Sequence, residues 1–145
     1  MKWMKRFSPN SLPRRPDVGL IGTRYVLPRS VSAALEYVFA EPVEGVIVIE
    51  NSLYARAHLG MSATTRPNRI LLAGGGAEFI ADPGLLLHEY YHVIRQWRPA
   101  YLTRWRYLLE SARHGYWANR YEREAREFAA AAEQGYRRYL QDLAQ

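Results

Sequence analysis

The pentapeptide HEYYH at residues 88–92, set among apolar residues, constrains this chain more than any other feature of its sequence. If the segment is an α-helix, His88 and His92 lie on one face, because residues i and i+4 stack with Cβ atoms about 5–6 Å apart. Two imidazoles placed in this way can bind one metal ion at about 2.0–2.1 Å. Glu89, beside the first imidazole, is then placed to take a proton from a metal-bound water. The pattern therefore predicts a metal-binding helix that carries its own base.

The residues around the pentapeptide favour a helix that is largely buried. Asp82 can accept hydrogen bonds from the free N–H groups of a first turn, and Pro83 at the first helical position loses no hydrogen bond. The expected helix runs through LLLHEYYHVIRQW and stops near Pro99. Its leucines, together with Val93 and Ile94, predict packing against a core. We therefore expect the histidines to lie in a preorganised wall of low dielectric constant.

A catalytic zinc site usually has a third protein ligand besides the two histidines. The metzincin pattern HExxHxxGxxH is absent, because Arg95 and Arg98 occupy its glycine and last histidine positions. The chain has no cysteine, so the third ligand must be His, Asp or Glu. The segment YEREAREFA at residues 121–129 offers three carboxylates: Glu122, Glu124 and Glu127.

This combination of motifs resembles the gluzincin peptidases, including the CAAX prenyl protease and ImmA/IrrE families. In those families HExxH is followed, some tens of residues later, by a helix with the pattern E-x-x-A-[DN]-x-F-A, whose first glutamate is the third zinc ligand. The chain has this pattern from Glu122 to Ala129, so the resemblance implies that Glu122 completes a zinc site with His88 and His92. Arg126 departs from the pattern, at the position where those families carry an acid or amide that steadies a histidine ligand.

A second, looser resemblance covers residues 45–97. The stretch ARAHLGMSATTRPNRILL and the helix after it are similar to the small zincin-like domain associated with contractile injection systems, in which a strand precedes a helix of the type LLAHELTHVVQQ. The two resemblances imply an α+β fold of the minimal zincin-like type. In that fold a small sheet packs against the HExxH helix and the C-terminal helices.

The patterns of the other segments predict the same fold class. Residues 30–145 are expected to form one domain, with helices that cover one face of a small sheet. The expected elements are a helix from Ser30 or Ser32 to about Ala40, strands at 46–49 and 70–73, the HEYYH helix, a helix at 102–113 broken by Gly115, and a long helix at 118–143 with a point of interruption at Gly135.

Residues 1–29 are expected to form a basic arm rich in Pro and Arg, with a short strand at 18–21. Residues 1–30 hold seven Lys and Arg and one Asp, so their charge is 7 − 1 = +6, which equals the net charge of the whole chain. Such an arm is either solvated or in electrostatic contact with nucleic acid, an anionic lipid surface or an acidic partner.

The sequence has no segment that predicts a membrane span or a Sec-type signal peptide. Apolar runs such as Val46–Ile49 are far shorter than the roughly 20 residues of a transmembrane helix. The basic N-terminal segment is followed by no continuous apolar stretch. The expected location is the cytoplasm, or outside the cell by a route without such a signal. The sequence does not indicate the oligomeric state.

The function implied is zinc-dependent hydrolysis of peptide bonds in a protein or peptide substrate, with Glu89 as the general base acting on a zinc-bound water. Two alternatives stay open. One is a zincin-like binding module without turnover, which the arginine at position 126 favours. The other is a protease recruited to nucleic acid by the basic arm.

Other residues complete this interpretation. A hydrogen-bond donor should stabilise the oxyanion, and the spacing singles out none of the candidates His114, Tyr116 and Tyr121. The strand at 70–73 can bind an extended substrate by edge pairing, as the resemblance to zincins implies. His58 is expected to be a surface or loop residue rather than a ligand.

Overall fold

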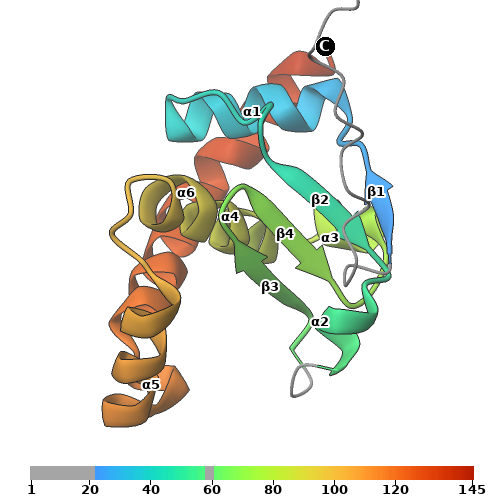
Figure 1. The fold of residues 1–145 in the computed structure, drawn as a ribbon. Coiled ribbons are helices and arrows are strands. Elements are labelled where there is room, and N and C mark those ends of the chain that lie inside the picture. Colours follow the sequence, from blue (N-terminus) through green and yellow to red (C-terminus); the bar gives the residue numbers. More distant parts are fainter. Residues whose placement is uncertain (1–21, 58–60) are drawn as a thin grey trace, which may run out of the picture.

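A four-stranded mixed sheet lies at the centre of the structure, a computed structural model that describes residues 22–57 and 61–145 (Figure 1). The strand order is β1-β2-β4-β3, with β2 and β4 parallel and the two outer strands antiparallel to their neighbours. With the helices described below, this sheet confirms the α+β fold class. The strands are β1 Thr23–Tyr25, β2 Ile47–Glu50, β3 Ala63–Arg66 and β4 Arg69–Leu72.

Two of these strands, β2 and β4, lie within one residue of the predicted strands. Strand β1 was not predicted, and it pairs with β2 inside the segment expected to be an arm. The boundary at residue 30 is therefore wrong, because the sheet already includes residues 23–25. The expected strand at 18–21, the rest of the arm up to residue 21, and His58 lie outside the described residues.

Strand β4 is an inner strand, which changes the expectation for substrate binding. It pairs with β2 on one side and with β3 on the other, so neither of its edges is free. The prediction that a substrate pairs with the strand at 70–73 is therefore wrong. The reason is an unrecognised hairpin: Pro67 and Asn68 form its turn, with Asn68 at φ 56°. The free edge on this side of the sheet belongs to β3.

Seven helical segments accompany the sheet in the described part of the chain, and none of them is both long and apolar enough to cross a membrane. They are α1 Arg29–Phe39, α2 Leu53–Ala57, α3 Gly76–Ala81, α4 Pro83–Tyr91, the π-helical segment η1 His92–Trp97, α5 Arg104–Ala118 and α6 Arg120–Leu143.

The hydrophobic core lies between the sheet and the helices α1, α4 and α6. Helix α6 packs along both α4 and α1, and the C-terminus lies near α1 (Figure 1). The sheet contributes four buried apolar residues to this core, Val48, Ala63, Ile70 and Leu72. The helices contribute Val31, Ala34, Leu35 and Phe39 from α1, Leu86, Leu87, Tyr90, Val93 and Ile94 from α4 and η1, and Ala129 and Tyr136 from α6.

The start of the HEYYH helix is as predicted. The Asp82 carboxylate accepts a hydrogen bond from the Leu85 N–H at 3.0 Å, and Pro83 is the first residue of α4. The helix continues to Trp97, but its last part is a π-helix, in which the Arg98 N–H donates to the carbonyl of Val93, five residues earlier, at 2.9 Å. The sequence did not predict this change of winding, which is frequent at functional sites.

The boundaries of the other helices differ in part from the prediction. Helix α1 begins at Arg29 without a side-chain cap, rather than after a capping serine. Gly115 interrupts α5 as predicted, with φ 74° and ψ 171°, a conformation that favours glycine. The Asn119 side chain caps α6 by accepting from the Tyr121 N–H at 2.9 Å. The expected interruption at Gly135 is wrong, since α6 runs unbroken to Leu143.

Candidate metal centre

Three side chains from two helices converge on one point. His88 Nε2 lies 3.0 Å from Glu122 Oε2, His92 Nε2 lies 3.4 Å from the same oxygen, and the two histidine nitrogens are 3.1 Å apart. The three side chains are almost fully buried, with exposed fractions of 13%, 5% and 5% for His88, His92 and Glu122. This is the ligand set that the sequence suggested.

The spacing of these three atoms fits a tetrahedral metal ion. In a tetrahedral zinc site with bonds of about 2.0–2.1 Å, neighbouring ligand atoms lie about 3.3–3.4 Å apart. The distances of 3.0–3.4 Å between the two imidazole nitrogens and the carboxylate oxygen are close to this value. Two nitrogens and one oxygen are also a usual donor set for catalytic zinc, with a fourth position left for water.

Helix packing brings Glu122 to the histidines, although 34 residues separate it from His88. The two histidines lie one helical turn apart across the junction of α4 and η1. Glu122 lies in the first turn of α6, which begins at the Asn119 cap and packs along α4. Asn119 is itself buried, and its Nδ2 donates to Ser111 Oγ at 2.8 Å. The start of α6, and with it the position of Glu122, is therefore fixed by hydrogen bonds.

Gln96 orients His92. The Gln96 Oε1 atom lies 2.6 Å from His92 Nδ1, and an amide oxygen can only accept a hydrogen bond, so Nδ1 carries the proton and Nε2 is left to face the cluster. The Gln96 Nε2 atom donates to the Tyr121 carbonyl at 3.0 Å and to Glu124 at 3.3 Å. Gln96 is fully buried, and it supplies the support for a histidine ligand that the resemblance assigned to position 126.

If the cluster binds zinc, replacing Gln96 with methionine is expected to weaken that binding about 10- to 100-fold, the usual effect of losing a partner of a metal ligand. Methionine keeps the volume but cannot accept the Nδ1 proton, so the tautomer and ring orientation of His92 are no longer fixed. Competition with a chromogenic chelator measures the affinity. Gln134→Met, on the exposed face of α6, is the matched control and should leave it unchanged. An unaltered affinity in the Gln96 variant would show that His92 needs no such support.

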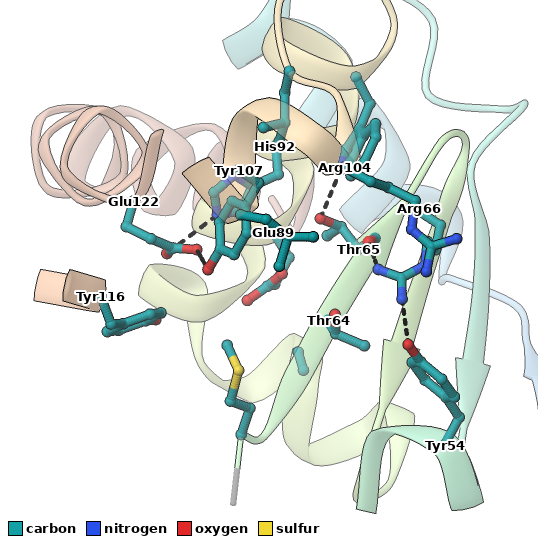
Figure 2. Close-up of a pocket in the computed structure, with 15 residues that line it drawn as sticks. Tyr54, Thr64, Thr65, Arg66, Glu89, His92, Arg104, Tyr107, Tyr116 and Glu122 are labelled. Carbon is teal, nitrogen blue, oxygen red and sulfur yellow. Dashed lines mark hydrogen bonds and ion pairs between the residues drawn. The ribbon is translucent and has the colours of Figure 1, made fainter. Parts of the chain in front are cut away.

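Tyr107 from α5 holds the other oxygen of the glutamate. Its hydroxyl donates to Glu122 Oε1 at 2.8 Å, which leaves Oε2 to the histidines (Figure 2). Burial and the nearby Glu122 charge raise the pKa of Tyr107, so the hydroxyl stays protonated. The pKa of Glu122 is instead lowered. Burial alone would raise this pKa, but hydrogen bonds from His88, His92 and Tyr107 outweigh burial and hold it well below its usual range. The carboxylate is thus kept ionised.

Glu89 lies beside the cluster but is not part of it. Burial raises the pKa of Glu89, and the neighbouring His92 and His88 only partly offset this effect. Glu89 is 6% exposed and forms part of the wall of both pockets described below. Burial lowers the pKa of His92, yet its hydrogen bond to Glu122 and the charges of Glu89 and Glu122 outweigh burial and raise it.

Two neighbouring pockets form a cleft over the cluster. The β3 pocket, of about 310 Å³, lies between β3, η1 and α5 and includes His92 and Glu122 in its wall (Figure 2). The α6 pocket, of about 800 Å³, lies between the start of α4 and the middle of α6 and includes His88. Four residues line both pockets: Met61, Ala63, Glu89 and Tyr116. The two pockets therefore border the cluster and Glu89 from two sides.

Of the three predicted oxyanion donors, the structure brings one to the cleft. Tyr116 follows the break at Gly115 and lines both pockets; burial, with the charges of Glu122 and Glu89, raises its pKa to about 12. His114 is exposed on α5 and lines neither pocket. Tyr121 is fully buried, and its hydroxyl accepts a hydrogen bond from Arg120 at 2.9 Å, away from the pockets.

The three arginines that depart from the family patterns have contacts of their own. Arg95 and Arg98 both bind Glu41, at 2.7 and 3.4 Å, and so tie the end of η1 to the loop after α1. Arg126 donates to the carbonyl of Trp117 at 2.6 Å and lies under its ring. Arg126 forms none of the hydrogen bonds of His88 or His92.

Sequence reasoning missed two residues of the centre, Gln96 and Tyr107. Gln96 could have been found, because it follows His92 by four residues and so shares its helix face. Tyr107 carries no such signal: it belongs to another helix, in a chain with 11 tyrosines. Comparisons of the chain with protein-family models, curated proteins and solved structures find no significant match.

Proposed function

We propose that this chain is a zinc-dependent metallopeptidase of the gluzincin type, with His88, His92 and Glu122 as the zinc ligands. The observation that carries the proposal is the triangle of two imidazole nitrogens and one carboxylate oxygen, 3.0–3.4 Å on a side, with Glu89 facing the same cleft. The motifs HEYYH and YEREAREFA agree with it. Zinc bound there would lower the pKa of a coordinated water towards about 7 and polarise the scissile carbonyl.

Glu89 is the general base of the proposed reaction. It takes a proton from the attacking water and delivers it to the nitrogen of the leaving amine. Burial raises its pKa, which is the direction that suits a base working near neutral pH. A glutamate also has two oxygens, one for the water and one free to reach the amine.

Tyr116 and Tyr107 are the proposed donors to the developing oxyanion. Both hydroxyls have raised pKa values, so both carry their protons at neutral pH and can donate. Tyr107 lines the β3 pocket alone and donates to Glu122 at 2.8 Å, whereas Tyr116 follows the glycine break and lines both pockets. Tyr116 is therefore the better placed of the two to move onto a substrate.

The edge of β3 is the proposed binding site for an extended peptide. Its outer side is unpaired in the sheet, and Thr64, Thr65 and Arg66 line the β3 pocket (Figure 2). A peptide added to this edge would form backbone hydrogen bonds that do not depend on its sequence. Its side chains would then alternate between the cleft and the solvent.

Metal analysis and a peptidase assay test the proposal together. Protein purified without a chelator should contain about one zinc ion per chain, since the described residues hold one such cluster. It should cleave members of a proteome-derived peptide library, identified by mass spectrometry. Treatment with a chelator should abolish cleavage, and added zinc should restore it. If the protein contains zinc but cleaves no peptide, the chain is a zinc-binding module rather than a peptidase. If it contains no zinc, the proposal is refuted.

A further inference from the structure

The wall of the α6 pocket carries a cation that has no anionic partner. Arg126 follows Glu122 by four residues on α6, so both side chains lie on the helix face that borders the cleft. No carboxylate of the described residues lies within 4.0 Å of its guanidinium. Its Nη1 atom is buried and has no hydrogen-bond partner among residues 22–57 and 61–145. An unsatisfied N–H of a charged group is costly, and a ligand that accepts from it would remove that cost.

The backbone holds one side of this guanidinium in place. Its Nη2 donates to the carbonyl of Trp117 at 2.6 Å, and the Trp117 ring lies 5.2 Å from the guanidinium carbon. Trp117 is 76% exposed, so its ring is held by little packing. The carbonyl fixes the orientation of the guanidinium, and Arg126 lines the α6 pocket. An arginine held in this way is suited to a carboxylate, which it can bind with two parallel hydrogen bonds.

The acidic residues around the pocket do not compensate this charge. Glu133, on the same wall, is already paired with Arg137 at 2.7 Å. Glu89 and Glu122 contribute two negative charges, which a bound divalent cation would neutralise. In the metal-loaded protein, Arg126 is then the one charged group of the α6 pocket that has no ionic partner in the described part of the chain.

We propose that Arg126 makes the α6 pocket a carboxylate-binding subsite, so that the enzyme selects peptides with a carboxylate close to the scissile bond. This inference rests on the proposed peptidase function. The carboxylate can come from an Asp or Glu side chain or from the C-terminus of the peptide, since the same guanidinium would bind either.

Paired peptides test the subsite. The zinc-loaded enzyme is given three sets of peptides. The first two sets are N-acetylated and C-amidated and differ only in carrying Glu or Gln at one position, which is scanned along the peptide. The third set carries Gln at that position and has a free C-terminus. At one position near the cleaved bond, kcat/KM should be at least about tenfold higher for Glu than for Gln, as expected for a charge-assisted hydrogen bond. A higher value for the third set alone would assign the pocket to the C-terminal carboxylate.

Substitutions at position 126 separate binding from a structural role. Arg126→Gln should abolish the preference for Glu over Gln, Arg126→Lys should keep part of it, and Arg126→Glu should reverse it, so that Gln is preferred over Glu. Simple loss of the Trp117 contact would lower kcat/KM for all peptides alike and could not reverse a preference. Arg123→Gln, on the exposed face of the same helix, is the matched control and should leave the ratio unchanged.

A binding measurement separates this inference from the proposed function. The zinc-loaded Glu89→Gln variant is titrated with fluorescently labelled members of the same peptide sets, and anisotropy gives the affinities. Tighter binding of carboxylate peptides that depends on Arg126 would support the subsite even if no peptide is cleaved. Equal affinities, or a preference that persists in Arg126→Gln, would refute it whether or not the chain is a peptidase.

Discussion

Glu89→Gln is expected to lower kcat by about 10²–10⁴-fold, the usual contribution of a general base, with zinc content and zinc affinity unchanged. Glutamine has nearly the same shape as glutamate but cannot take a proton from water. The side chain faces the cleft and is not one of the three residues whose ligand atoms converge, so the metal site should not be disturbed. Steady-state kinetics on a cleaved peptide and metal analysis of the same preparation measure the two effects.

The stability of the metal-free variant distinguishes loss of catalysis from loss of structure. The folded chain raises the pKa of Glu89, so it holds the proton more tightly than the unfolded chain does. The cost of ionising Glu89 is therefore absent below the unfolded pKa of about 4.5, grows as the pH rises above it, and reaches its full value above the raised pKa of the folded state. Glutamine avoids this cost, so near pH 7 the midpoint of thermal unfolding should be unchanged or higher.

The matched control for this substitution is Glu127→Gln, at an exposed position of α6. It should alter neither kcat nor zinc content. A Glu89→Gln variant with activity within about threefold of the wild type would contradict the role of Glu89, because the loss of a general base costs at least about a hundredfold.

Loss of any one of the three proposed zinc ligands is expected to abolish stoichiometric zinc binding. His88→Ala, His92→Ala and Glu122→Ala should each weaken zinc binding by more than the roughly 10- to 100-fold that the loss of a supporting residue costs. The reason is direct: each side chain supplies one of three atoms that lie 3.0–3.4 Å apart. His114→Ala is the matched control, since this histidine is exposed on α5 and should leave zinc content unchanged.

Thermal unfolding gives a second measurement of the same effect. Zinc at 100 times its dissociation constant should stabilise the wild type by about 2.7 kcal/mol. For a domain of this size, that corresponds to a rise of roughly 5–11 °C in the unfolding midpoint. The ligand variants should show no rise at the same zinc concentration. A zinc-dependent rise that survives in His92→Ala would place the metal elsewhere in the chain.

The sequence predicts those parts of the candidate metal centre whose spacing is set by helix geometry alone. The two histidines and Glu89 follow from the period of an α-helix, and the Asp82 cap and apolar flanks follow from rules that act within a few residues. The pattern from Glu122 to Ala129 identified the acid that reaches the histidines, although only a family resemblance, and not local spacing, pointed to it. These features could be predicted because each is encoded in a short segment of the sequence.

The sequence could not give the contacts that depend on how distant segments pack. Tyr107 reaches Glu122 because α5 folds back on α6, and Tyr116 reaches the cleft because of the turn at Gly115. The position of β4 inside the sheet follows from pairing with β2 and β3, which periodicity within one strand cannot reveal.

The sequence by itself determined that His88, Glu89 and His92 lie together on one helix, because the spacing within a helix is fixed by hydrogen bonds between near neighbours. Only the tertiary structure decided which side chains support and surround them. Gln96 replaces the expected support at position 126, and Arg126 instead binds the Trp117 carbonyl and lines the α6 pocket. These assignments follow from the packing of α4, α5 and α6, whose contacts join residues far apart in the chain.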